Sequence, residues 1–183
     1  MATSAMRAER YSTGAIWFHW IIAALVIFNI VVGLFHDGVP ALRALMPAHK
    51  AIGITVLILT LGRIAWRFAH PAPALPAGLP AWERQASKAN QAIFYILMLV
   101  MPLSGWIMVS SGAHPRPISW FGLFDVPLLT IRSAHDASGT IHALGGYLFA
   151  ALAVLHIAAA LRHQYLLRNG LLYRMIPVRP RRS

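Results

Sequence analysis

Two histidines, His142 and His156, interrupt an apolar run from Gly139 to Leu161 that is long enough to cross a bilayer. They are fourteen positions apart, close to four helical turns, so both imidazoles share nearly one face about 21 Å apart along the axis. Ionisable residues inside a hydrophobic span are costly and usually functional, and imidazole binds transition metals and haem iron readily. The pattern predicts two metal sites stacked on one helix.

Two more histidines, His19 and His49, lie near the starts of other apolar runs. In a bundle whose helices alternate in direction, His19 is level with His156 near one membrane surface, and His49 is level with His142 near the other. Each pair can supply two axial nitrogens to one haem, which leaves no open position on the iron and suits electron transfer. Four further histidines at the ends of spans are interpreted as interfacial and set aside as ligands: His36, His70, His114 and His135.

The apolar runs predict an all-α fold, an integral membrane four-helix bundle in which residues 1–183 form a single membrane domain. The spans are expected at roughly 15–35, 48–68, 90–110 and 139–161. Hydrophobic residues make up 58% of the chain and charged residues 11%, against about 25% charged in soluble domains. Pro102 predicts a kink in the third span, and residues 118–124 are too short to cross and are expected in the interface.

Charges on the loops predict the orientation. The first and third loops carry only Arg43, Lys50, Arg116 and Arg132, whereas the second loop, the helix ends beside it and the two terminal regions carry the other twelve Lys and Arg. The positive-inside rule then places both termini in the cytoplasm. The net charge of +11 is therefore a sign of membrane topology, and no nucleic-acid partner is expected.

The chain contains no cysteine, which excludes disulfides, thiolate-bound iron–sulfur clusters and covalent attachment of c-type haem. Any haem must be held non-covalently. Structural zinc normally needs four ligands at one point, and two separated histidine pairs do not provide them. A third interpretation, in which the histidines only make interhelical hydrogen bonds, remains open.

Motifs around the histidines extend along most of the chain. They are Ile-Trp-Phe-His-Trp at His19, Pro-Ala-His-Lys-Ala-Ile-Gly at His49, Ile-His-Ala-Leu-Gly-Gly-Tyr at His142, Leu-His-Ile-Ala-Ala-Ala-Leu-Arg-His-Gln-Tyr at His156 and His163, and Met-Ile-Pro at 175–177. From Tyr11 to Pro177 the chain resembles the prokaryotic cytochrome b561 family. The resemblance implies a four-helix bundle with two b haems on the paired histidines, exchanging electrons with quinone across the bacterial inner membrane.

One class within that family oxidises superoxide at the outer surface and reduces ubiquinone near the inner haem. The resemblance therefore implies a superoxide:ubiquinone type of oxidoreductase, with His163 at the quinone site. Here Gln164 follows His163, where a second histidine can occur in the family. Lys50 and Arg132 are expected to form a positive patch that focuses a small anion on the outer haem.

Two functions of different kinds remain beside this one. The chain could be the membrane-anchor subunit of a dehydrogenase, passing electrons between a redox protein and the quinone pool. It could also be a non-redox membrane protein whose histidines only join its helices, with membrane lipid as a partner in either case. The predicted function is a di-haem b-type cytochrome that transfers electrons between an outer donor and ubiquinone.

Overall fold

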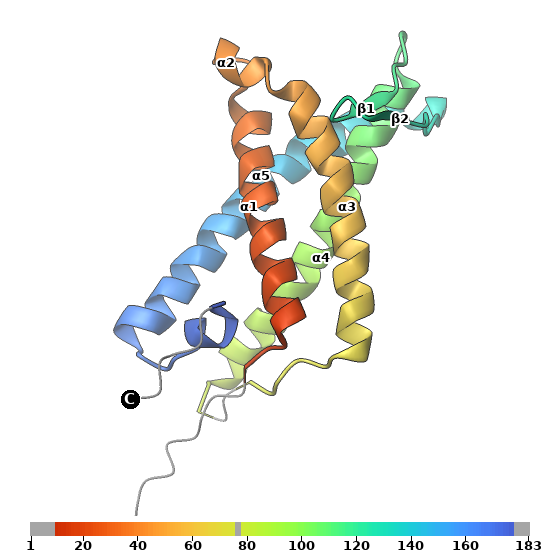
Figure 1. Cartoon of the computed structure of the whole chain (residues 1–183). Helices are drawn as coiled ribbons and strands as arrows, with labels where there is room; N and C mark the ends of the chain where they lie inside the picture. The colour runs from red at the N-terminus through yellow and green to blue at the C-terminus, as the bar shows by residue number, and fades with distance from the viewer. Residues whose placement is uncertain (1–9, 76–77, 178–183) are drawn as a thin grey trace, which may run out of the picture.

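The computed structural model describes residues 10–75 and 78–177. Four long helices dominate it: α1 (Thr13–Phe35), α3 (Met46–Ala69), α4 (Ala81–Ser111) and α5 (His135–Leu161). They form a bundle in which α5 runs obliquely behind α1 (Figure 1). All four are long and apolar enough to cross a membrane. The predicted helical membrane bundle is therefore confirmed, while residues 1–9 and 178–183, which include both termini, lie outside the described residues.

Short elements join the long helices. They are α2 (Pro40–Arg43), β1 (Ile118–Trp120), β2 (Phe124–Val126), a 3₁₀ turn η1 (Arg132–Ala134), a π-helical turn η2 (Arg162–Leu166) and a 3₁₀ turn η3 (Leu172–Met175). The strands pair antiparallel with Trp120 opposite Phe124, and Phe121 and Gly122 between them both have positive φ. This hairpin departs from the all-α prediction, because strands of three residues are too short for a recognisable alternation of side chains.

Two long helices start earlier than their apolar runs. α4 begins at Ala81 rather than near residue 90, because the polar segment before the span continues the helix, and α5 begins at His135 rather than Gly139. α4 also continues through Pro102 without interruption of the helix. Proline is tolerated in membrane helices where neighbouring groups satisfy the freed backbone carbonyl.

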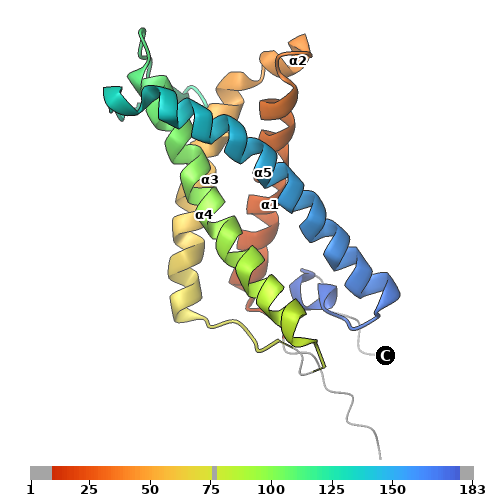
Figure 2. The same ribbon diagram turned by 180° about the vertical axis from the view of Figure 1, so that it is seen from behind.

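The helices pack mainly as two pairs, α1 with α3 and α4 with α5, and α3 also contacts α4. The view from behind shows α4 and α5 in front, crossing near the top of the bundle (Figure 2). A small apolar core joins them, formed by Ile22, Val26, Val56, Leu97, Met98 and Phe149. Many other large apolar side chains are exposed on the helix surfaces, as expected where the surroundings are lipid tails.

The two ends of the bundle differ. One end carries α2 and the β1–β2 hairpin, and is called the hairpin end. The other carries the start of α1 and the last described residues, and is called the terminal end (Figure 1). At the terminal end, Trp20 Nε1 donates a hydrogen bond to the carbonyl of Met175 at 2.6 Å. The buried Arg174 donates to the carbonyl of Ala74 at 2.8 Å, which ties the chain end to the connector between α3 and α4.

Candidate functional site

The structure brings the four membrane histidines together as two facing pairs. The rings of His49 and His142 lie at the hairpin end with their centroids 6.1 Å apart and their planes at 78°. The rings of His19 and His156 lie at the terminal end, 6.3 Å apart and at 74°. These are called the hairpin-end pair and the terminal-end pair. Each pair combines a histidine from α1 or α3 with one from α5, which is the pairing predicted from their levels in the bundle.

The spacing within each pair fits one metal ion between two imidazoles. A first-row metal is bound to histidine nitrogen at about 2.0–2.1 Å, and a ring centroid lies about 1 Å behind its nitrogen, so two axial rings are separated by about 6 Å. In the described parts of the chain, no group of three or more His, Asp or Glu side chains could hold a metal. The geometry thus favours bis-histidine ligation over a four-ligand zinc site.

At the hairpin-end pair, the backbone of α4 orients His142. Its Nδ1 lies 3.0 Å from the carbonyl oxygen of Met101 and 3.2 Å from the hydroxyl of Ser104. A carbonyl can only accept, so Nδ1 carries the hydrogen and Nε2 has a free lone pair. Histidines that bind metals characteristically donate their other ring hydrogen in this way. The ring of His142 is therefore set to bind a metal through Nε2.

Two glycines make room for the rings of the hairpin-end pair. A Cβ at Gly105 would lie 2.8 Å from Cε1 of His142, and one at Gly33 would lie 3.1 Å from Cε1 of His49. Each ring therefore packs against bare backbone of a neighbouring helix, where any other residue would crowd it. His49 Nδ1 is buried and has no hydrogen-bond partner.

Side chains surround the terminal-end pair. The ring of Trp20 lies 5.4 Å from that of His19, and the ring of Phe94 lies 5.3 Å from that of His156. The amide of Asn90 lies 3.3 Å from Nδ1 of His156. An amide nitrogen can only donate, so Nδ1 of His156 accepts here, unlike the donating Nδ1 of His142. Binding of a metal at Nε2 would require the amide of Asn90 to turn its oxygen toward Nδ1.

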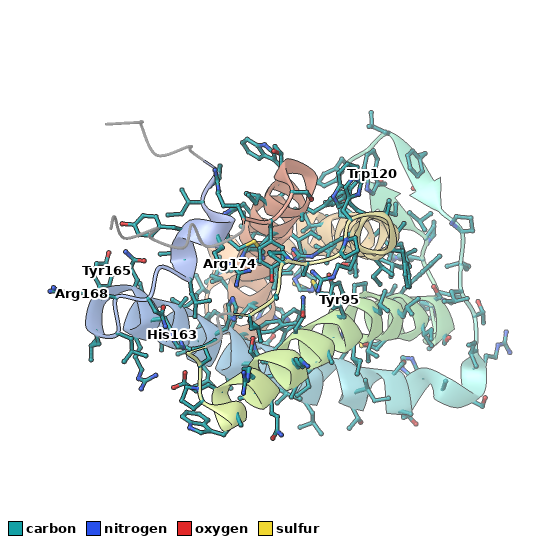
Figure 3. All side chains as sticks on the ribbon, turned by 90° about the horizontal axis from the view of Figure 1, so that it is seen from below. Tyr95, Trp120, His163, Tyr165, Arg168 and Arg174 are labelled. Carbon is teal, nitrogen blue, oxygen red and sulfur yellow. The ribbon has the colours of Figure 1, made fainter. Side chains whose placement is uncertain are left out.

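Beyond His156, the π-helical turn η2 carries His163. Its Nδ1 lies 2.7 Å from the amide nitrogen of Asn169, and its Nε2 lies 3.8 Å from a carboxylate oxygen of Glu83 at the start of α4. The other oxygen of that carboxylate accepts a hydrogen bond from Arg162 at 3.1 Å. In the view from below, His163 lies toward α4, whereas Tyr165 and Arg168 point away from the bundle (Figure 3). His163 is thus held by polar partners that the sequence did not reveal.

Each end of the bundle has a cavity. At the terminal end, a cavity of about 330 Å³ is lined by Gln164, Tyr165, Arg168, Gly170 and Tyr173, and His163 is not among its lining residues. At the hairpin end, a cavity of about 430 Å³ is lined by residues that include Lys50, Met108, His114, Arg116, Ile118 and His135. Arg132, expected beside Lys50, is exposed in η1 and does not line this cavity. Arg116 lines this cavity together with Lys50.

Comparison with known protein sequences places nearly the whole chain in one family. The sequence model of the family described as prokaryotic cytochrome b561 matches residues 10–178. The chain belongs to this family. It is 32% identical to "Cytochrome b561 homolog 2" of Escherichia coli over 92% of both chains. It is also 32% identical to "Cytochrome b562" of Cereibacter sphaeroides over 93% of this chain and 96% of that protein.

A third relative carries a functional name. The chain is 25% identical to "Probable superoxide oxidase CybB" of Yersinia pestis over 92% of this chain and 97% of that protein. Membership of the family implies b-type haem and electron transport in a membrane. The two histidine pairs fit that cofactor, because the ring centroids of each pair are separated by the distance expected for two imidazoles on one metal.

Several residues of the site were missed by sequence reasoning. Asn90, Gly33 and Gly105 face rings of the paired histidines from neighbouring helices, and Glu83 lies near His163. Alanine and glycine are common throughout the spans, so the two important glycines carry no distinguishing signal. Glu83 could have been singled out from the sequence, because carboxylates are rare in this chain, which has five Asp and Glu in all.

Proposed function

We propose that this protein is a di-haem b-type cytochrome of the bacterial inner membrane that carries electrons from an outer donor to ubiquinone. The observation that supports it best is the presence of two His–His pairs at 6.1 and 6.3 Å, one at each end of a membrane bundle. His49 and His142 would hold one haem, and His19 and His156 would hold the other. Haem b held by two imidazoles would supply reversible one-electron transfer without binding oxygen.

The orientation of the bundle follows from its charges. Under the positive-inside rule the terminal end faces the cytoplasm and the hairpin end faces outward. The fold keeps Tyr11 and Arg174 together, with the amide of Tyr11 donating to the carbonyl of Arg174 at 3.3 Å. Both described ends of the chain therefore lie at the side assigned to the cytoplasm.

The hairpin-end cavity suits a small anionic donor. Lys50 follows the haem ligand His49 directly, and it shares the cavity with Arg116 and without any Asp or Glu among the lining residues. Such a positive concavity attracts an anion by focusing the local field. Superoxide is the anion proposed, in line with the printed name of one relative. Each superoxide gives up one electron and leaves as dioxygen, so the enzyme is a superoxide:ubiquinone oxidoreductase.

The terminal end is proposed to serve ubiquinone, which takes up two electrons and two protons to become ubiquinol. His163 lies beyond the ligand His156 on the same chain segment, and Glu83 lies 3.8 Å from its Nε2. This carboxylate and imidazole can hold a proton between the surface and the quinone. Gln164, which lines the adjacent cavity, supplies an amide in place of a second imidazole.

A reduced-minus-oxidised visible spectrum of the purified protein, with its haem-to-protein ratio, tests the proposal. Two b haems per chain with separable spectra are expected. Absence of a haem spectrum would leave the histidines as interhelical contacts. Superoxide-driven reduction of a ubiquinone analogue then tests the donor and acceptor. Haems without that activity, together with co-purification of a soluble dehydrogenase, would instead assign the chain as a membrane-anchor subunit.

A further inference from the structure

A cation inside the span lies level with the terminal-end pair. Arg63 is six residues before the end of α3, and His19 is six residues after the start of α1. At 1.5 Å per residue, both Cα atoms are about 9 Å from the same end of the bundle. The side chain of Arg63 is partly buried, which is unusual for a residue expected to extend to the headgroups.

The residue before Arg63 packs against the residue before His19. Gly62, the preceding residue, faces the ring of Phe18, since a Cβ there would lie 3.4 Å from that ring, and Phe18 directly precedes His19. The guanidinium of Arg63 is within electrostatic range of His19 and also of His156. It thus contributes a positive charge that acts on both histidines of the terminal-end pair.

Tyr95 holds Arg63 in that position. Arg63 Nε donates to the Tyr95 hydroxyl at 3.1 Å, and the guanidinium lies over the Tyr95 ring, 5.7 Å from its centroid. Tyr95 follows Phe94, whose ring contacts His156, and it lies on the side of α4 that faces the other helices (Figure 3). Within residues 10–75 and 78–177, no carboxylate lies at ion-pair distance from Arg63.

The hairpin-end pair has a different electrostatic environment. Its nearest cation in the sequence is Lys50, which is exposed, so solvent and salt screen its charge. A charge inside a bundle of low dielectric constant acts more strongly at the same distance than one in water. Reduction adds one negative charge to a site, so a nearby buried cation favours the reduced form.

We infer that Arg63, positioned by Tyr95, raises the reduction potential of the haem held by His19 and His156 above that of the haem held by His49 and His142. The electron is then more stable at the terminal end, and transfer from the hairpin end toward the quinone is downhill. This inference rests on the proposed di-haem function. In this inference Arg63 acts through its charge on one haem and does not bind the iron, and Tyr95 holds Arg63 in place.

Spectroelectrochemical titration of the purified holoprotein tests it, with H49A and H19A backgrounds used to observe each haem alone. R63Q should shift the potential of the terminal-end haem downward and leave the hairpin-end haem nearly unchanged. R63K should restore most of the shift, and Y95F should shift the same haem downward by less. R67Q is the matched control, because Arg67 lies one turn further along α3 with its guanidinium over the Tyr11 ring, 6.0 Å from the centroid.

Three outcomes overturn the inference: no shift in R63Q, equal shifts of both haems, or an equal shift in R67Q. If R63Q fails to retain the terminal-end haem, Y95F decides, and an unchanged potential there also overturns the inference. Failure of the proposed function looks different, because the unmodified protein would then lack one or both haems.

Discussion

The hairpin-end pair and the terminal-end pair hold their histidines by different means. At the hairpin end, the Met101 carbonyl orients His142, and Gly105 leaves space for its ring. At the terminal end, the Asn90 side chain contacts His156 and Phe94 packs on it. The first arrangement relies on backbone atoms, and the second relies on side chains.

This difference bears on which site can be altered by substitution. A backbone carbonyl is present whatever the side chain, so most substitutions leave the acceptor of His142 in place. A side-chain amide can be removed, and the cation near it can be removed or neutralised, by a single change. We therefore expect the terminal-end site to be the more adjustable of the two, and the hairpin-end site to be sensitive mainly to added volume.

The largest expected effect separates the two sites completely. H49A or H142A should remove the hairpin-end haem and spare the other, whereas H19A or H156A should do the reverse, because each haem loses one of two axial bonds. Haem content and difference spectra of the four purified variants measure this. If H49A and H19A lost the same spectral component, the pairing would be wrong.

Loss of the side chain that contacts each ligand should affect the two sites unequally. N90A removes the partner of His156 Nδ1, and a lost partner of this kind typically costs about 10- to 100-fold in metal affinity or activity. S104A should cost less, because Met101 still accepts from His142. Haem retention during titration with apomyoglobin compares the variants. Equal losses in both would contradict the distinction between backbone and side-chain support.

Replacing a glycine beside a histidine ring with alanine should affect the hairpin-end pair more than the terminal-end pair. G105A places a methyl group where the His142 ring lies, and crowding of this kind costs about 1–3 kcal/mol. G33A should cost less, since its Cβ contact with His49 is 3.1 Å rather than 2.8 Å. G38A is the control, because a Cβ there has no neighbour within 4 Å. Thermal unfolding monitored through the haem bands measures the three, and a G105A protein as stable as G38A would disprove the close fit.

The smallest expected effect concerns the anion cavity. Superoxide oxidation should slow a few-fold as salt rises, because exposed charges are screened beyond about 8–10 Å at 0.1–0.15 M salt. K50Q combined with R116Q should flatten that dependence without loss of haem. K50Q combined with R132Q should flatten it less, since Arg132 does not line the cavity. Stopped-flow rates across a salt series distinguish the pairs, and identical slopes in all proteins would exclude electrostatic delivery.

Much of the fold could be predicted from the sequence, because length and hydropathy define a membrane span almost without reference to tertiary contacts. The residues at which the helices begin and end were less predictable. α4 extends back to Ala81 through Glu83 and Asn90, since helix formation does not stop where apolar residues stop. The β1–β2 hairpin rests on a turn at Phe121 and Gly122 and on contacts such as Trp120 Nε1 donating to the Thr55 hydroxyl at 3.0 Å.

The candidate site also has a part that could be predicted from the sequence and a part that could not. The arrangement of four histidines in two level pairs follows from order, depth and alternating helix direction, and these are properties of the sequence. The partners of the histidines are not. Whether Asn90 meets His156, or Gly105 meets His142, depends on the rotation and tilt of α4 against α5, and no local pattern specifies those angles.

One helix, α5, carries a histidine of each pair. The interval between His142 and His156 is therefore set by helix geometry, at about 21 Å, and not by how the neighbouring helices dock. Electron tunnelling depends steeply on distance. In the proposed di-haem protein, α5 would therefore set the separation across which the electron passes between the two haems. A change in the tilt of α1 or α3 would therefore alter how the histidines of each pair meet, while the interval between His142 and His156 along α5 would remain nearly constant.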